Sequence, residues 1–470
     1  MWALDRGRGI PPTTRGRARA RCECRCRASP SIPTRRGKGE RPRAATREEI
    51  GGFEREAQAV VEENGIRCED GHLDEILSVY GRGRPKLILT RGTWEPLDID
   101  GERIRARGRL MFKNNSETQE LFVPDIVARA QVLSRGSIDG VSARVKIRPR
   151  HDLADGYESP DTVPREDDYW STYILQGSSR TFIDLVVTIE AGEASVLREV
   201  TACCVEVEYG CYGPSGLETY SQHVVLPIHY PDPSSPPKVF SDQTHAKGGE
   251  KATFSLHSVP THLLYHDDDP LDVVERYVKP HAQPGDILAV AETPLAIMQG
   301  RYRHPTTIAP SFLARVLCKL FHPTSSVATA CGMQALVDIV GPIRALFAAV
   351  VGVFLKFFRI SGFFYKMAGA QAGLLDDISG TIAPYDKFIC LGPRNVQRFV
   401  DSVEAKFGLG AAVVDVNDLS KKTKLLTILA KTRGVDEDFV HRALLPNPAG
   451  NADQQTPFVL IRPAQKASAH

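Results

Sequence analysis

The sequence lacks several features that would place the protein in a specialised class. It has no long hydrophobic segment: the apolar run 345–355 holds only 11 residues, whereas a helix that crosses a bilayer needs roughly 20. The 10 cysteines are scattered without a regular spacing, which favours thiols over a disulfide framework. No apolar segment follows the basic N-terminus, so a secretory signal peptide is not expected. The length of 470 residues leaves room for two or three domains, and the 42% hydrophobic and 25% charged fractions are ordinary for a globular protein.

The formal net charge of +2 hides an uneven distribution. Residues 1–45 hold 13 Lys and Arg against 3 Asp and Glu, and the remaining chain holds 46 against 54. The mildly acidic body is not expected to bind nucleic acid. Residues 1–45 show no hydrophobic periodicity and are predicted to be disordered. Their Arg-rich, acid-poor composition fits an organellar transit peptide, and a mispredicted start codon is the alternative.

The next part of the chain changes its periodicity twice. Apolar residues at helical spacing predict a helical segment over 46–85. Over 86–233, apolar and polar residues alternate in at least six runs separated by turn signals, which predicts an antiparallel, immunoglobulin-like β-sandwich. The stretch 234–251 is rich in Pro, Ser, Gly and Lys and is predicted to be a linker.

Residues 252–470 read as an α/β domain, so the predicted fold class is an α+β chain with a sandwich before an α/β domain. The run Ile287–Ala291 predicts a strand buried on both faces, which ends at Glu292–Pro294 because proline cannot donate to a sheet ladder. Helical spacing over Val396–Phe407 predicts a helix, with Asn395 as its N-cap and Gly408 just past its end. Three further short apolar runs predict strands: Phe388–Leu391, Ala411–Val414 and Phe458–Ile461.

Polar side chains follow two of these predicted strands directly. Glu292 and Thr293 come after the first, and Asp415 comes after Val414. Open α/β sheets bind ligands at the carboxyl ends of their strands. Carboxylates gathered there can hold Mg²⁺ or Mn²⁺ through hard oxygen ligands, as nucleotide chemistry requires.

Several short segments, taken in order, resemble the coenzyme F420-0:gamma-glutamyl ligase family. Those enzymes use GTP and a divalent metal to join glutamate to a deazaflavin cofactor by an amide bond. The segments are Pro260–Leu264 with the acidic residues after it, Gly285–Ala291, Gly300–Arg301, Gly373–Asp377, Ala411–Asp415, Gly450–Asp453 and Pro457–Arg462. The whole chain resembles a form of this ligase family that is found in cyanobacteria and plastids. The resemblance implies a small-molecule substrate and a chloroplast location, either soluble or at a membrane periphery.

The resemblance also implies a set of site residues, although it assigns no catalytic residue. The divalent metal would be held by Asp376, Asp377 and Asp415. The nucleotide would be contacted from three places in the chain, by Val259, Pro260, Thr261, His262, Glu292, Thr293, Gly450, Asn451, Asp453 and Gln454.

Two positions depart from the family pattern. Where the family has a phosphate-facing lysine and a glutamate, this chain has Ile297 and Gln299. Isoleucine cannot make the charge-assisted contact that a lysine makes. The alternative function is therefore a non-catalytic binding or assembly module derived from the ligase fold, and the sequence leaves open whether the domain is an enzyme.

The segment 336–365 has no counterpart in the family pattern. Its apolar run 345–355 is bracketed by Arg344, Lys356 and Arg359 and followed by aromatic residues. One interpretation is a helix buried in the core or in a partner interface. The other is an interfacial helix whose basic and aromatic flanks contact a membrane surface.

Overall fold

The computed structural model describes residues 77–100, 103–153, 169–245, 251–323, 325–358, 362–377, 382–416, 426–444, 448–449 and 454–463. These all belong to one compact unit, 66–470. The predictions for residues 1–45, and for the helical segment as far as residue 76, lie outside the described residues.

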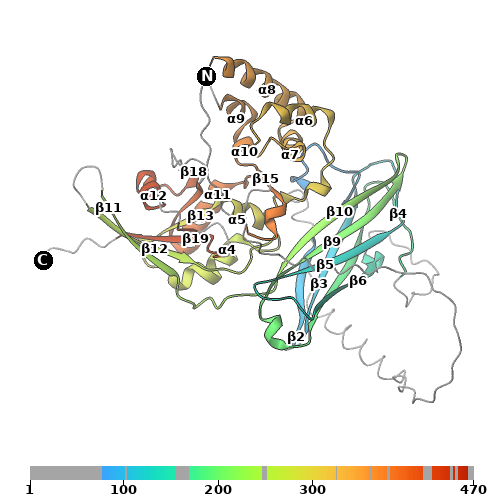
Figure 1. Cartoon of the computed structure of the whole chain (residues 1–470), viewed down its shortest axis with the longest axis horizontal. Coiled ribbons are helices and arrows are strands. Elements are labelled where there is room, and N and C mark those ends of the chain that lie inside the picture. The colour runs from blue at the N-terminus through green and yellow to red at the C-terminus, as the bar shows by residue number, and fades with distance from the viewer. Residues whose placement is uncertain are drawn as a thin grey trace, which may run out of the picture. The chain divides into compact units, whose positions relative to one another are not determined.

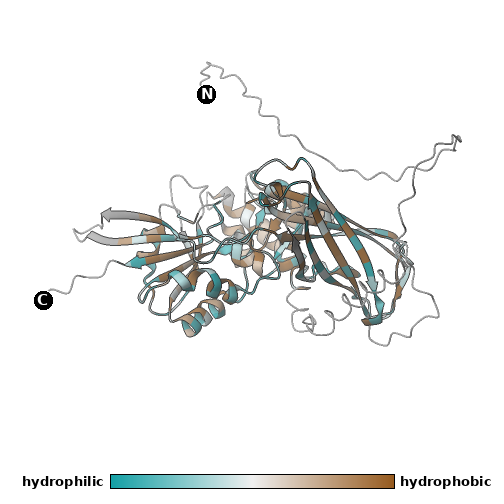
Figure 2. Ribbon diagram, turned by 90° about the horizontal axis from the view of Figure 1, so that it is seen from below, coloured by the Kyte–Doolittle hydropathy of each residue, from teal (hydrophilic) through white to brown (hydrophobic). Residues whose placement is uncertain are grey.

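The N-terminal region contains two antiparallel sheets. The first has the order β1-β3-β8-β6, with β2 also paired to β3. Its strands are β1 Leu87–Leu89, β2 Thr93–Asp100, β3 Arg103–Asn114, β6 Val141–Arg150 and β8 Arg180–Ala191. Teal and brown segments alternate along strands of the protein in Figure 2, because successive side chains point to opposite faces of a sheet.

The second sheet has the order β10-β9-β4-β7, and β5 also pairs with β9. Its strands are β4 Leu121–Val123, β5 Ile126–Ser134, β7 Tyr173–Leu175, β9 Val200–Gly213 and β10 Gly216–Pro227. The turn between β9 and β10 places Gly216 at φ +91°, a conformation that glycine adopts without steric cost.

Apolar side chains from both sheets form one buried cluster. Leu110 and Ile183 of the first sheet share it with Val205 and Val224 of the second. The predicted antiparallel sandwich is therefore confirmed. The six cysteines among the described residues are free thiols, as the scattered spacing predicted.

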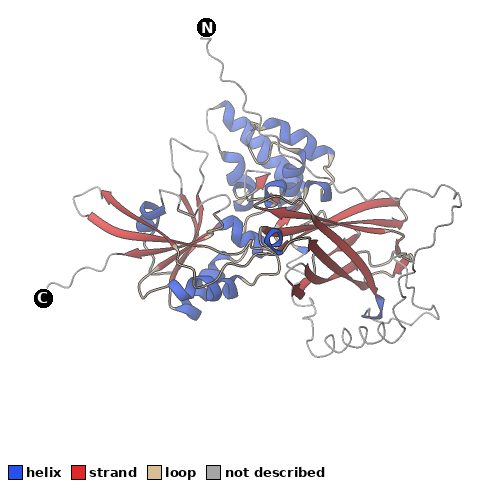
Figure 3. Ribbon diagram, turned by 60° about the horizontal axis from the view of Figure 1, so that its bottom comes forward, coloured by secondary structure: helices blue, strands red, loops and turns tan. Residues whose placement is uncertain are grey.

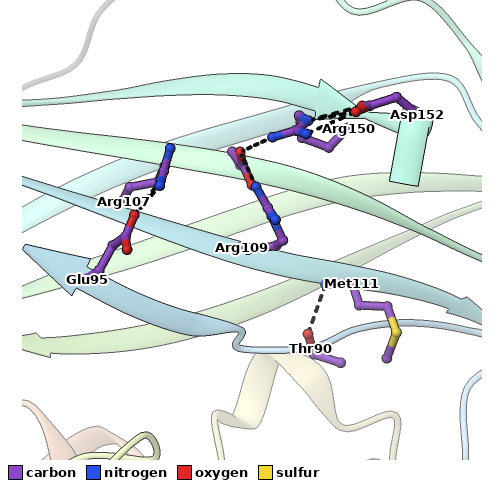
Figure 4. A network of polar contacts seen from close by, with 8 residues as sticks. Thr90, Glu95, Arg107, Arg109, Met111, Arg150 and Asp152 are labelled. Atoms are coloured by element: carbon purple, nitrogen blue, oxygen red, sulfur yellow. Dashed lines mark hydrogen bonds and ion pairs between the residues drawn. The ribbon is translucent and has the colours of Figure 1, made fainter. Parts of the chain in front are cut away.

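Asp184 on β8 organises the polar side chains on the outer face of the first sheet. Its two carboxylate oxygens accept from Arg109 Nε and Nη2 at 2.8 and 3.0 Å. Arg150 Nη1 donates to the same carboxylate at 3.2 Å. Figure 4 shows Arg150 paired with Asp152 as well. Glu95 and Arg107 form a separate ion pair across β2 and β3. Only 4% of the Asp184 surface is exposed, so these arginines compensate a buried charge.

The C-terminal region is built on a mixed sheet with the order β11-β12-β19-β13-β17-β18 (Figure 1). Its strands are β11 Lys238–His245, β12 Lys251–Val259, β13 Ile287–Ala291, β17 Gly410–Val416, β18 Leu426–Lys431 and β19 Phe458–Pro463. Only β13 and β17 run parallel among these pairs in the described chain. β11 lies within 234–251, so the linker prediction is wrong there: Lys238–His245 pairs with β12 as the edge strand.

Helices cover both faces of this sheet. Leu288 and Val290 of β13 pack on one face with α4 Pro270–Val273, the π-helix η3 Val274–Val278 and α11 Val396–Phe407. Ala289 packs on the other face with α12 Glu437–Leu444. Alternate residues of β13 thus enter different buried clusters, which confirms the strand predicted to be buried on both faces. The fold class, a sandwich followed by an α/β region, is also confirmed (Figure 3).

The predicted strand ends where expected, because α5 Glu292–Met298 begins directly after β13, and Pro294 occupies the first turn of α5, where no backbone N–H is needed. Two details differ from the sequence predictions. The run Phe388–Leu391 is not in the main sheet. Its residues form β16 Ile389–Cys390, between β14 Tyr302–Arg303 and β15 Asp376–Asp377. Asn395 precedes α11, but it is left-handed at φ 51° and its side chain does not cap the helix.

Residues 312–373 form a group of helices on their own buried cluster. They are α6 Phe312–Leu317, η6 Cys318–Leu320, α7 Ala330–Val340, α8 Pro342–Phe357, α9 Phe363–Ala368 and α10 Ala370–Gly373. No single described helix is long and apolar enough to span a membrane, although α7 and α8 together reach that composition across a bend of 116°. The remaining short elements are η2 His151–Leu153, α3 Ala194–Leu197, η4 Lys279–His281, η5 Pro305–Thr307 and η7 Tyr385–Lys387.

Candidate functional site

The parallel strands β13 and β17 end at the same edge of the main sheet. Their register pairs Ala291 with Val414, so the next residues, Glu292 and Asp415, lie beside each other. β12 ends and β19 begins at this edge too, since Val259 and Val290 both pair with Phe458. Sequence segments more than 100 residues apart therefore meet where the pattern predicted a ligand site.

Glu292 is the most unusual of these residues. Only 7% of its surface is exposed, and within the described residues its Oε2 atom has no hydrogen-bond partner. Burial, followed by repulsion from the nearby Asp415 and Asp376, raises the pKa of its carboxyl to about 9. A buried carboxyl without a counterion favours its neutral form or a bound cation.

Asp376 reaches the same place from β15. Thr293 Oγ1 donates to Asp376 Oδ2 at 3.4 Å, which links this carboxylate to the first turn of α5. Burial raises the pKa of Asp376, and the Thr293 hydrogen bond opposes that shift. Burial, followed by repulsion from Asp376, raises the pKa of Asp415 to about 6. We call Glu292, Asp376 and Asp415 the carboxylate cluster.

Asp377, which was predicted to hold the metal together with Asp376 and Asp415, does not join this cluster. Successive residues of a strand point to opposite sides, and Asp377 Oδ2 accepts from Thr329 Oγ1 at the start of α7. Glu292, which the sequence assigned to the nucleotide, lies in the cluster. In the part of the chain that the structure describes, no group of three or more His, Cys, Asp and Glu side chains is arranged to hold one metal ion.

The segments predicted to line a nucleotide site are brought together at the same edge. Thr261 N donates to Gln455 O at 2.9 Å, so the segment after β12 lies against the loop before β19. Ser258 Oγ holds the other end of that loop by donating to Pro448 O at 2.7 Å. Gln454 is exposed there. Gly450, Asn451 and Asp453 lie outside the described residues.

His262 faces inward, so its ring is not available to a nucleotide. Its Nδ1 lies 3.0 Å from Tyr277 Oη, and its Nε2 lies 3.0 Å from both oxygens of Asp268. The ring also stacks on Tyr230, and only 2% of the residue is exposed. The predicted contact of His262 with a ligand is therefore not supported, and the ring fixes the segment that follows β12.

The two positions that depart from the family pattern have structural roles. Ile297 is buried among Tyr302, Tyr385 and Phe388. Gln299 makes two hydrogen bonds to the backbone of Arg394, at 2.9 and 2.8 Å. Both side chains are thus committed to packing and loop structure.

Two residues near the site were not identified from the sequence. Cys390 on β16 is buried, and burial together with the nearby Asp376 raises its pKa to about 12, so its thiol stays neutral. Arg91 connects the sandwich to this region: Nη1 donates to Gly300 O at 2.8 Å, and the guanidinium lies 4.0 Å from the ring centroid of Tyr302. Contacts between residues about 210 positions apart leave no local pattern in the sequence.

Comparison with known proteins concerns mainly the sandwich. Residues 88–230 match the model of the N-terminal Ig-like domain of F420-0:gamma-glutamyl ligase. The resemblance to this ligase family is confirmed. The match covers the Ig-like domain of the ligase family and not the region that carries the carboxylate cluster. No curated protein matches the chain.

Solved structures give weaker similarities. The GAE domain of GGA2p from Saccharomyces cerevisiae is 16% identical, with a TM-score of 0.18, over 31% of this chain and 92% of that one. The yeast GGA1 GAE domain is 12% identical, with a TM-score of 0.16, over 29% of this chain and all of its own. At these scores the sandwich assignment rests on the sheet topology and the family match.

Proposed function

We propose that the C-terminal region is a metal-dependent, nucleotide-binding domain of the amide-ligase kind, with a small-molecule substrate. The observation that carries the proposal is the carboxylate cluster at the ends of β13 and β17, in which Oε2 of the buried Glu292 has no hydrogen-bond partner among the described residues. The family match of the sandwich supports the same reading, since the ligases of that family carry this Ig-like domain.

The carboxylate oxygens of the cluster are of the kind that a divalent cation prefers. Asp376 raises the pKa of Asp415, and both raise the pKa of Glu292, so a bound cation would relieve this repulsion. Mg²⁺ in nucleotide enzymes is commonly held by only one or two carboxylates, with water and phosphate oxygens completing its shell. Glu292 and Asp415 would supply the protein oxygens, and Asp376, held by Thr293, would orient or join them.

The chemistry that the bound metal supplies is neutralisation of phosphate charge during formation of an acyl phosphate. The chain's own contribution is positioning. The backbone of Val259, Pro260 and Thr261 is fixed by the contact with Gln455 and by the buried ring of His262. Together with the loop at Gln454, this edge would line a GTP or ATP site next to the carboxylate cluster.

Calorimetric titration of the full chain tests the proposal. We expect Mn²⁺ and Mg²⁺ to bind, and GTP or ATP to bind more tightly in their presence. Asp415→Asn and Glu292→Gln should weaken metal binding by about tenfold or more, because each removes a charged oxygen ligand. Glu404→Gln on the exposed face of α11 is the matched control and should leave binding unchanged. Nucleotide binding that is absent, or indifferent to Asp415→Asn, overturns the proposal.

A second function, a non-catalytic binding or assembly module, is favoured by one specific observation. Ile297 and Gln299 stand where the ligase pattern has charged groups, and both are engaged in packing or backbone contacts. Incubation with GTP or ATP, Mn²⁺, glutamate and candidate acids separates the two functions. Release of phosphate that depends on the acceptor supports the ligase. Metal and nucleotide binding without turnover supports the module.

A further inference from the structure

Helix α8 buries its small side chains and exposes its large apolar side chains, whereas an ordinary surface helix buries the large apolar ones. Its buried side consists of small residues: Ala345, Ala348 and Ala349 are almost fully buried. Gly352 continues this side, and a Cβ atom there would lie 3.1 Å from Phe364 Cβ, so α8 approaches α9 closely. Small residues inside leave the large apolar residues outside.

The outer side of α8 is a continuous apolar stripe. It consists of Ile343, Leu346, Phe347, Val350, Val353 and Phe354, which we call the α8 face. Their spacing of three and four residues places them on one side of the helix. Phe347, Val350 and Phe354 are 55%, 60% and 63% exposed. Soluble proteins rarely expose contiguous apolar surface of this kind unless it binds something.

Neighbouring α6 extends the surface. Phe312, Val316 and Leu320 recur every fourth residue along α6 and η6, and Phe312 is 83% exposed. Figure 1 shows α8 and α6 side by side, and α8 follows α7 directly at Gly341. Of 20 large apolar side chains that are exposed in the described chain, 10 lie between residues 312 and 358. The apolar surface is therefore concentrated in this one group of helices.

The part of the chain that carries the α8 face has exposed charge of mainly one sign. Between residues 305 and 375 the sequence contains six Lys and Arg but a single acid, Asp338. That acid is 4% exposed and pairs with Arg303 Nη1 at 2.7 Å, so it does not reach the surface. Arg315, Lys319, Arg344 and Lys366 are all exposed. A second copy of this face would bring like charges together, whereas an anionic partner would complement them.

We infer that the α8 face, with its basic rim, binds the surface of a bilayer that contains anionic lipids. α8 has 16 residues and is about 24 Å long, so it can lie in the plane of the interface with its apolar stripe among the acyl chains. The exposed lysines and arginines would lie at the level of the headgroups. This surface is separate from the carboxylate cluster and does not depend on the proposed nucleotide chemistry.

Vesicle sedimentation of the full chain tests the inference. We expect binding to vesicles of phosphatidylcholine with phosphatidylglycerol, and much weaker binding to phosphatidylcholine alone. The basic residues 1–45 could also attract anionic vesicles, so the assay is repeated at about 1 M NaCl, where the screening length is only about 3 Å. Binding should fall there toward the weaker level expected for phosphatidylcholine alone, because only the apolar contact remains, and loss of all binding at high salt overturns the inference.

The decisive variant is Phe347→Ser/Val350→Ser/Phe354→Ser, which leaves residues 1–45 unchanged. Its affinity for anionic vesicles should fall about tenfold or more, because three partly inserted apolar side chains are lost. Ile174→Ser/Leu217→Ser/Val239→Ser removes three exposed apolar residues elsewhere and should bind like the parent. Lys319→Glu/Lys366→Glu should weaken binding at low salt. Equal binding by the α8 variant and the control overturns the inference.

Phe354→Trp reports on the face directly, even if the triple variant folds poorly. Its added fluorescence should shift to shorter wavelength with anionic vesicles, whereas Tyr212→Trp on the sandwich should not shift. An emission already at short wavelength without vesicles would mean that another part of the chain, or a second copy, covers the face, which overturns the inference. If the molecular mass of the protein in solution falls on dilution, the group that covers the face is a second copy of the chain.

Discussion

Glu292 and Asp415 lie side by side because the parallel strands β13 and β17 end in register, Ala291 beside Val414. One carboxyl is buried with an unpaired oxygen, and the other is half-buried. Burial raises the pKa of both carboxyls, and repulsion from neighbouring carboxylates adds to each shift, so the folded protein disfavours the charged forms of these two groups.

Glu292→Gln should stabilise the metal-free protein at alkaline pH. The folded-state pKa of Glu292, about 9, exceeds its ordinary value of 4.5, so between these values the folded state holds a proton that the unfolded state has lost. Stability therefore falls as the pH rises through this window, and glutamine removes that loss. We expect Tm at pH 8 to rise by about 4 °C or more, with little change near pH 4.5. Scanning calorimetry in the presence of a chelator measures Tm, with Glu404→Gln as the control. If Tm of the parent and of Glu292→Gln changed with pH in parallel, the prediction would be contradicted.

Ile297→Lys should unfold the region around α5 rather than restore a phosphate contact. Ile297 is 5% exposed and packs among aromatic rings, and an unpaired ammonium group there is strongly destabilising. We expect a loss of about 3 kcal/mol or more in urea unfolding, against about 1 kcal/mol for Ile297→Leu. Tighter nucleotide binding by Ile297→Lys at unchanged stability would show that this side chain does face the phosphate.

Arg91→Ala should loosen the contact between the sandwich and the region of Gly300. The guanidinium donates to the carbonyl oxygens of Gly300 and Tyr302, and both acceptors are left without that donor in the variant. The expected loss is about 2–3 kcal/mol, since charged hydrogen bonds in buried positions are lost. Hydrogen exchange should quicken at residues 300–303 while the strands of the sandwich stay protected. Arg129→Ala is the control, because Arg129 forms only an exposed ion pair of 3.8 Å with Glu208, and its loss should have little effect.

Asp184→Asn should destabilise the sandwich. The substitution leaves Arg109 and Arg150 without the carboxylate that accepts from both, while the shape of the side chain is kept. We expect a loss of about 2 kcal/mol in urea unfolding, because the lost hydrogen bonds are charge-assisted and shielded from water. Glu208→Gln, whose pair with Arg129 is exposed and 3.8 Å long, should change stability by less than about 0.5 kcal/mol. Equal effects of the two substitutions would contradict the burial argument.

The sequence by itself determined the elements whose periodicity is strong. Alternation over β3, β8 and β9 predicted the sandwich, and the short run Ile287–Ala291 predicted a strand with both faces buried. These patterns succeed because side-chain direction is fixed by the local backbone, with a period of two in strands. The prediction of a linker over 234–251 was partly wrong, because a Pro- and Ser-rich composition does not reveal that Lys238–His245 can pair with β12.

The tertiary structure alone decided which carboxylates lie near one another. Asp376 and Asp377 are neighbours in sequence, yet the pleat of β15 turns one toward Thr293 and the other toward Thr329. Glu292 joins Asp376 and Asp415 only because three separate segments meet at one sheet edge. The exposure of the α8 face could not be predicted from the sequence either, because a periodic apolar stripe can pack against the core or face the solvent. That choice is made by the small residues that let α8 approach α9.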